Sequence, residues 1–146
     1  MLSLIKSSVK VELEVITKED KVEILFNGVS ITNETSAPFY SVSADKTVIE
    51  LAEGTQNTLT DGESYEFAPG EDEPNACLFA KDDLTIKGTG SLTVNANYNN
   101  GITSKNDLKL NGCTITVDAE KNGIRGNDSI TIKDATLQIH CGKDAL

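Results

Sequence analysis

The chain has 146 residues, with 13 Lys and Arg against 23 Asp and Glu, and a formal net charge of −10. Nucleic acids are bound by clustered cations, and Arg125 is the only arginine, so this composition excludes nucleic acid as a partner. No apolar run approaches the roughly 20 residues that a membrane-spanning helix needs, and we expect no membrane insertion.

The first predicted element is a strand near the N-terminus. The segment Val9-Lys-Val-Glu-Leu-Glu-Val15 alternates apolar and charged residues, which is the period-two pattern of a half-buried strand. Similar short segments recur along the chain, each followed by Gly, Asn or Asp, and none sustains helical periodicity. We therefore predict an all-β protein in which residues 1–21 form an N-terminal strand or cap.

Two early units of a repeat come next in the chain. The segment Phe26–Ile31 matches Leu110–Ile115, and residues 48–51 mark the start of another unit. After these units the chain contains the run Pro69-Gly-Glu-Asp-Glu-Pro74. This run is too acidic and too interrupted by proline to pair as a strand, so we expect an exposed acidic loop insertion at residues 61–75.

The repeat is clearest in the second half of the chain. Ile130 follows Leu108 by 22 residues, and Leu108 follows Leu84 by 24. A unit of this length cannot bury its own apolar face, so successive units must stack and each must add one strand to several parallel sheets. We therefore predict that residues 22–146 form a right-handed, single-stranded parallel β-helix of about five coils, each of roughly 22 residues.

The same repeat predicts which side chains face the interior. Rows of buried aliphatic side chains supply most of the stability, at about 1.5–3 kcal/mol for each fully buried member. The expected rows are Leu78/Ile102/Ile124/Leu146, Leu84/Leu108/Ile130, Ile86/Leu110/Ile132, Leu92/Ile115/Leu137 and Val94/Val117/Ile139. Because Asp144–Leu146 begins a further unit, we predict an open C-terminal end that is continued in a longer protein or associates end to end with a second copy.

Three segments resemble a known family. They are Ala44–Gly62, Lys81–Val94 and Tyr98–Ile102, of which the first is the most specific. The resemblance is to bacterial carbohydrate-binding β-helix proteins, whose fold is related to that of pectate lyases. It implies polysaccharide binding, bound calcium, and export to the cell surface or beyond it. Asn100 and Asn122 stand where this family often has Asp, which weakens any calcium site at those positions.

Stacking also creates an acidic ladder on the outer surface, in which equivalent residues of successive coils lie about 4.7–4.9 Å apart. The ladder consists of Asp82, Asn106 and Asp128 beside Asp83, Asp107 and Ser129. Its oxygen atoms suit Ca²⁺, and the predicted metal ligands are Asp82, Asp83, Asn106, Asp107 and Asp128. The alternative is that these side chains bond neighbouring backbone groups and form a stacked amide ladder. Both interpretations remain open.

Two groups of side chains are predicted to contact sugar. Tyr98 is the one aromatic residue of a polar loop, and its ring suits stacking on a sugar face, with Asn97 and Asn99 beside it. The alternative is that Tyr98 folds over its own loop. Lys109 and Thr131 belong to an outward row whose polar side chains suit hydrogen bonds to sugar hydroxyls. Such rows also occur on any solvated β-sheet surface.

We predict a protein that binds polysaccharide without cleaving it, with calcium as a candidate cofactor and, as the family implies, an extracellular or cell-surface location. One alternative is a fragment of a pectate-type lyase, whose chemistry needs Ca²⁺ and a basic side chain. Arg125, Lys105 and Lys81 are the candidates for that base, but a solitary arginine is more often a solvated side chain, and no catalytic residue is assigned. The other alternative is a structural solenoid or adhesin.

Overall fold

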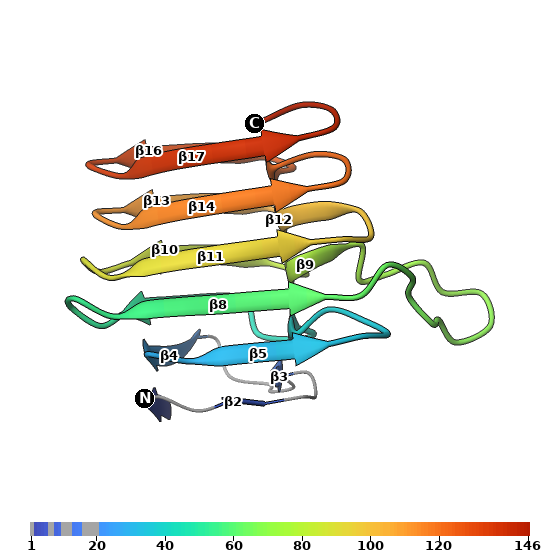
Figure 1. Ribbon diagram of the computed structural model, residues 1–146, viewed down its shortest axis with the longest axis horizontal. Helices are drawn as coiled ribbons and strands as arrows, with labels where there is room; N and C mark the ends of the chain where they lie inside the picture. Colours follow the sequence, from blue (N-terminus) through green and yellow to red (C-terminus); the bar gives the residue numbers. More distant parts are fainter. Residues whose placement is uncertain (1, 6–7, 10–12, 16–20) are drawn as a thin grey trace.

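The computed structural model describes residues 2–5, 8–9, 13–15 and 21–146, which form 17 strands and no helix. The strands wind into a coil, and each complete turn contributes one strand to each of three parallel sheets (Figure 1). The predicted all-β parallel β-helix of about five coils is confirmed. No helix long and apolar enough to span a membrane occurs in the described part of the chain.

The three sheets run the length of the stack. The first sheet contains β1 (Leu2–Ile5), β4 (Lys21–Asn27), β7 (Lys46–Leu51), β10 (Asp83–Lys87), β13 (Asp107–Asn111) and β16 (Ser129–Lys133). The second contains β2 (Ser8–Val9), β5 (Ser30–Asn33), β8 (Gln56–Asp61), β11 (Ser91–Ala96), β14 (Thr114–Ala119) and β17 (Thr136–Cys141). The third contains β3 (Leu13–Val15), β6 (Phe39–Ser41), β9 (Ala76–Ala80), β12 (Asn100–Ser104) and β15 (Ile124–Gly126).

The N-terminal segment contributes to all three sheets. Strand β1 pairs with β4, β2 with β5 and β3 with β6, all in parallel. The expected strand at 9–15 and the expected cap at 1–21 fall partly on residues 10–12 and 16–20, which lie outside the described residues.

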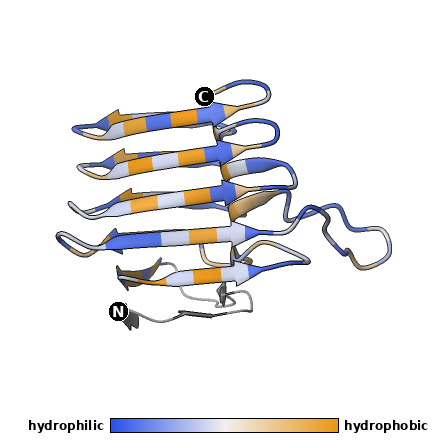
Figure 2. Ribbon diagram, viewed as in Figure 1, coloured by the Kyte–Doolittle hydropathy of each residue, from blue (hydrophilic) through white to orange (hydrophobic). Residues whose placement is uncertain are grey.

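The pairing register confirms the predicted interior rows. Leu84 pairs with Leu108 and Leu108 with Ile130, and neither leucine has any exposed surface. The other rows that pair as predicted are Ile86/Leu110/Ile132, Leu92/Ile115/Leu137, Val94/Val117/Ile139 and Leu78/Ile102/Ile124. Figure 2 shows the resulting alternation of hydrophobic and hydrophilic residues along the strands. Two predicted interior residues of the last coil are exposed: Ile132 to 41%, and Leu146, expected to continue the row of Ile124, to 58%.

The earliest coils differ from the predicted alignment. Ile31 pairs with Leu59 in the row that continues to Val94 and Val117, so Ile31 is equivalent to Val117 and not to Ile115. The chain therefore turns two residues later in this coil.

A buried side chain stabilises this later turn. Asn57 occupies the interior position of Leu92 in the next coil, and its Oδ1 atom accepts hydrogen bonds from the N–H groups of Gly28 at 2.8 Å and Val29 at 2.9 Å. Its Nδ2 atom donates to the carbonyl oxygen of Ser91 at 3.1 Å. One asparagine thus connects three successive coils, and it satisfies two backbone donors that would otherwise lack partners.

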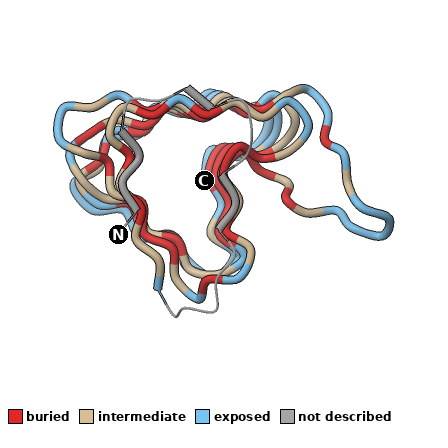
Figure 3. Tube along the Cα trace, turned by 90° about the horizontal axis from the view of Figure 1, so that it is seen from below, coloured by how far each residue is buried: buried red, intermediate tan, exposed pale blue. Residues whose placement is uncertain are grey.

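One segment leaves the stack. Residues 62–75, here called the insertion loop, connect β8 to β9 without forming a strand and project to one side (Figures 1 and 3). Because of this loop, Thr47 of β7 and its partner Leu84 of β10 are 37 residues apart. The loop and the turn after β11 lie on the same side of the stack (Figure 1).

Candidate functional site

The acidic ladder is connected by hydrogen bonds. Asn106 Nδ2 donates to Asp82 Oδ1 at 2.9 Å, and the N–H of Asp107 donates to Asp83 Oδ1 at 3.1 Å. Ser129 Oγ in turn donates to Asp107 Oδ1 at 2.7 Å. The exposed Asp128 follows the same path, because its N–H donates to the carbonyl oxygen of Asn106 at 3.0 Å. These contacts correspond to the amide-ladder interpretation of these residues.

The surroundings of the ladder also bear on metal binding. Lys46 and Lys109 line the same small depression, of about 10 Å³, as Asp83 and Asp107. Cations beside carboxylates reduce their attraction for a further cation. Within the described residues, no group of three or more His, Cys, Asp or Glu side chains is arranged to hold a metal ion.

A second ladder of amides lies at the start of the third sheet. Asn100 Oδ1 accepts a hydrogen bond from the N–H of Asn122 at 3.2 Å, and Asn122 Oδ1 accepts one from the N–H of Asp144 at 3.3 Å. Each side chain thus bonds the backbone one coil ahead. These asparagines, which stand where the resembled family often has aspartate, stabilise the stacking of the turns.

Tyr98 lies in an aromatic cluster with two residues of the insertion loop. Its ring stacks on that of Tyr65, with ring centroids 4.2 Å apart and planes inclined by 18°. Phe67 completes the cluster, with its centroid 6.3 Å from that of Tyr98. Tyr65 is buried, whereas Tyr98 and Phe67 are half-buried and leave part of their rings open to solvent. Asn97 is exposed and Asn99 is half-buried on the same turn.

Asp61, the last residue of β8, connects the insertion loop to the next coil. It is 3% exposed. Tyr65 Oη donates to Asp61 Oδ2 at 2.5 Å, and the N–H of Asn97 donates to Asp61 Oδ1 at 2.5 Å. Asn97 Nδ2 also donates to the carbonyl oxygen of Asp61 at 2.8 Å. Burial raises the pKa of Asp61 to about 6, although these hydrogen bonds oppose the shift.

Sequence reasoning did not find Asp61, Tyr65 or Phe67. The insertion loop has no repeat, so no alignment of coils places its aromatic residues next to Tyr98. The available signal was compositional: Tyr65 and Phe67 are two aromatic residues in an otherwise acidic segment of a chain with only 5% aromatic residues.

The residues predicted to contact sugar form two separate groups. Asn97, Tyr98 and Asn99 lie on the turn after β11, beside the insertion loop. Lys109 of β13 pairs with Thr131 of β16, and both are exposed on the outer face of the first sheet. Figure 1 shows β13 and β16 behind β14 and β17, on a different side of the stack from the turn.

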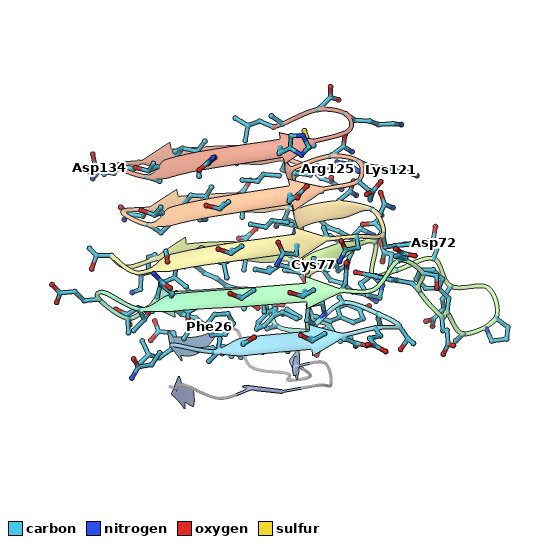
Figure 4. All side chains as sticks on the ribbon, in the orientation of Figure 1. Phe26, Asp72, Cys77, Lys121, Arg125 and Asp134 are labelled. Carbon is cyan, nitrogen blue, oxygen red and sulfur yellow. The ribbon has the colours of Figure 1, made fainter. Side chains whose placement is uncertain are left out.

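The basic residues considered for lyase chemistry have different surroundings. Lys105 Nζ lies 2.6 Å from Glu73 Oε2 of the insertion loop, and this contact raises the pKa of Lys105. Lys81 Nζ lies 5.9 Å from the centre of the Tyr40 ring. Arg125 is exposed (labelled in Figure 4), and its Nη2 atom lies 3.5 Å from Asn127 Oδ1. Because its pKa is raised, Lys105 is a poorer proton acceptor than an ordinary lysine, and Lys81 and Arg125 remain as the candidate bases.

The chain is similar to known proteins over most of its length. A family described as "Carbohydrate-binding domain-containing protein" matches residues 5–146. A protein of the same description from Acetivibrio thermocellus is 56% identical over 105 residues, which are 71% of this chain and 37% of that protein.

The chain is also similar in fold and sequence to a solved structure. It is described as the polysaccharide lyase-like protein from C. thermocellum, as a gadolinium derivative, and it matches with a TM-score of 0.86 and 44% sequence identity. The match covers 98% of this chain and 64% of the solved chain. The chain therefore spans less than two thirds of the length of both proteins that it matches.

Proposed function

The chain belongs to the family of carbohydrate-binding domain-containing proteins, and from this premise we propose that it binds polysaccharide on its β-helix surface without cleaving it. The observation that carries the proposal is the aromatic cluster of Tyr65, Phe67 and Tyr98, which presents two half-buried rings next to the exposed amide of Asn97.

This arrangement suits a sugar ring chemically. A pyranose has C–H groups on its faces and hydroxyl groups around its edge. An aromatic ring packs against the apolar face, while an amide both donates to hydroxyls and accepts from them. Tyr98 supplies the first kind of contact, and Asn97 and Asn99 supply the second. Because Tyr98 already stacks on Tyr65, little conformational freedom is lost when a sugar binds.

The ligand we propose is an extended polymer. A single sugar makes too few contacts to offset its lost translational freedom, whereas a polymer also reaches neighbouring coils. Lys109 and Thr131 are proposed as a second, separate contact on the first sheet. The proposal includes an extracellular or cell-surface location, which the resemblance to exported β-helix proteins implies.

We propose that calcium assists the binding of acidic polysaccharides. The protein carries a formal net charge of −10 and repels a polyanion. A Ca²⁺ ion bound by oxygen atoms of the acidic ladder and by glycan carboxylates would offset this repulsion. The residues that would contribute are Asp82, Asp83, Asn106, Asp107 and Asp128, whose oxygen atoms are the ligand type that Ca²⁺ prefers. Because these side chains alone are not arranged to hold a metal ion, the glycan carboxylates would have to supply the remaining ligands.

Retention on immobilised polysaccharide tests the proposal. Neutral xylan and polygalacturonate are compared, the latter with calcium and with a chelator. We expect Tyr98→Ala to weaken retention by roughly tenfold, because loss of one stacked ring costs on the order of 1–2 kcal/mol. Tyr40→Ala is the matched control, since Tyr40 is also half-buried but lies on the third sheet. Equal losses in the two variants would contradict the assigned site.

A second candidate function is polysaccharide lysis, which is favoured by the description of the solved structure and by the exposed Arg125. The same polygalacturonate samples distinguish it, because lysis produces unsaturated products that absorb ultraviolet light. Rising absorbance that Arg125→Ala abolishes would replace the binding proposal with lysis. Failure of every polysaccharide to retain the protein would favour a structural solenoid.

A further inference from the structure

Asp61 is buried, and no cation among the described residues balances its charge. The groups that contact its carboxyl group are neutral donors: the hydroxyl of Tyr65 and the N–H of Asn97. Among the described residues, the titratable side chains that interact with it are Tyr65 of the insertion loop and Cys77 of β9, and the backbone of Tyr98 also donates a hydrogen bond to it. An ionised carboxylate in such a position is costly even when it accepts hydrogen bonds, because it has lost its hydration.

The surroundings of Asp61 depend on the insertion loop. Tyr65 comes from the loop, and its hydroxyl donates a hydrogen bond to the carboxyl group of Asp61. The same ring is the surface on which Tyr98 stacks. A local opening of the loop around Tyr65 therefore hydrates Asp61 and removes the support of Tyr98. The loop has further anchors, since the N–H of Glu66 donates to the carbonyl oxygen of Thr35 and Glu73 pairs with Lys105, so this opening stays local.

We propose that Asp61 is a pH-sensitive positioning residue for the aromatic cluster. Its neutral form keeps the ring of Tyr65 stacked on that of Tyr98, and its ionisation favours the locally open loop. Polysaccharide binding at Tyr98 then strengthens as the solution is acidified. This last consequence rests on the proposed function, whereas the coupling between Asp61 and the loop does not.

The direction of this pH effect follows from thermodynamic linkage between proton binding and closure of the loop. In the closed state burial raises the pKa of Asp61 to about 6, above its ordinary value of 3.8. The closed state therefore binds the proton more tightly than an open, hydrated state, and acid favours closure. Burial also raises the pKa values of Tyr65 and Cys77, so both stay neutral through this range. The chain's one histidine, His140, lies in β17.

Amide hydrogen exchange of the free protein tests the coupling without any sugar. We expect the protection factors of the Asn97 and Tyr98 amides, corrected for intrinsic exchange, to fall by roughly tenfold in total between about pH 5 and pH 8, with most of the change complete soon after the pH passes 6. In Asp61→Asn, which keeps an acceptor for the Asn97 N–H, these protection factors should stay constant at the wild-type level of low pH.

Two further variants test whether Asp61 is the group that titrates. Tyr65→Phe removes a hydrogen bond that stabilises the ionised carboxylate, so the midpoint of the change should move to higher pH. Asp72→Asn makes the same substitution at an exposed position of the same loop (labelled in Figure 4) and should leave the midpoint unchanged. All variants carry His140→Gln, because histidines ordinarily titrate near neutral pH. Wild-type protection that is flat from pH 5 to pH 8, or pH dependence that persists in Asp61→Asn, would overturn the proposal.

Retention on neutral xylan then connects this coupling to binding. We expect retention of the wild type to be stronger at about pH 5 than at pH 8, and that of Asp61→Asn to be the same at both. If Tyr98→Ala leaves retention unchanged, the proposed sugar site is wrong, and the exchange data still decide the role of Asp61. If exchange depends on pH but retention does not, the loop does not regulate binding.

Discussion

At the scale of single residues, neighbours in the sequence differ sharply in their expected contribution to stability. Leu108 has no exposed surface and lies between Leu84 and Ile130 in the interior, whereas the next residue, Lys109, is exposed on the outer face. The pleat of a strand points successive side chains to opposite faces, and only one face of each strand lies against the core.

We therefore expect Leu108→Ala to lower the free energy of unfolding by about 2–5 kcal/mol, through lost burial and the cavity left behind. Lys109→Ala is the matched control and should change it by less than about 0.5 kcal/mol. Urea denaturation of both variants measures the difference. Similar losses at the two positions would show that the assigned register is wrong.

Asp61 gives a second prediction for a single residue, this time for global unfolding. Its pKa is about 6 in the folded protein and 3.8 in its ordinary state, so the folded protein binds the proton more tightly. The resulting stabilisation is complete at low pH and is lost as the pH rises through 6. We expect the free energy of unfolding of the wild type to fall, relative to that of Asp61→Asn, by on the order of 2 kcal/mol from pH 4 to pH 8.

The comparison with Asp61→Asn is needed because the chain has 23 acidic residues, whose titration also affects stability. The difference between the two proteins isolates Asp61. A difference that stays constant with pH would mean that Asp61 is hydrated in the folded protein.

At the scale of elements, the turns between strands depend on close backbone contact between coils. Gly88, after β10, has a φ of +99°, and a Cβ atom there would lie 2.3 Å from the carbonyl oxygen of Leu51 in the coil below. Gly112, after β13, has a φ of +76°, but a Cβ atom there would meet nothing closer than 3.8 Å. Both turns use a left-handed conformation, and only the first also needs the absence of a side chain.

Gly88→Ala should therefore cost more than Gly112→Ala. Strain in the left-handed region amounts to roughly 1–2 kcal/mol in either variant, and the clash adds to it only at Gly88. Thermal unfolding of the two variants, which introduce the same side chain at equivalent turns, measures the excess. Equal shifts in Tm would show that the backbone at Leu51 moves away from the new Cβ atom at little cost.

At the scale of the whole molecule, stability should vary along the stack. Strands β10 and β11 pair on both sides, whereas β16 and β17 have one paired neighbour each within the described structure. Leu137 and Ile139 of β17 are correspondingly only half-buried, although they continue interior rows. In a solenoid each coil contacts its neighbours alone, so a loss of burial in one coil is not shared by the whole molecule.

Hydrogen exchange of the 146-residue chain should reveal this gradient. We expect the greatest protection in β10, β11 and β12 and a decline through β14 to β17, because opening a coil with one neighbour breaks fewer contacts. Uniform protection along the stack would indicate fully cooperative unfolding or a partner that covers β16 and β17.

The sequence by itself determined the repeating part of the molecule. Leu84, Leu108 and Ile130 recur at intervals of 22 or 24 residues, and stacking such units is the arrangement that buries every member of a row. Where coils share one pattern, the position of a residue in its unit decides whether it faces the interior. Fold class, parallel pairing and interior rows were therefore predictable.

Only the tertiary structure decided the parts that do not repeat. The later turn before Ile31 depends on the buried Asn57, a contact between residues 28 positions apart. The cluster of Tyr65 with Tyr98, and the burial of Asp61 beneath it, depend on how the insertion loop folds back on the next coil. No periodicity restricts that path, since it results from side-chain packing and hydrogen bonds between segments distant in sequence.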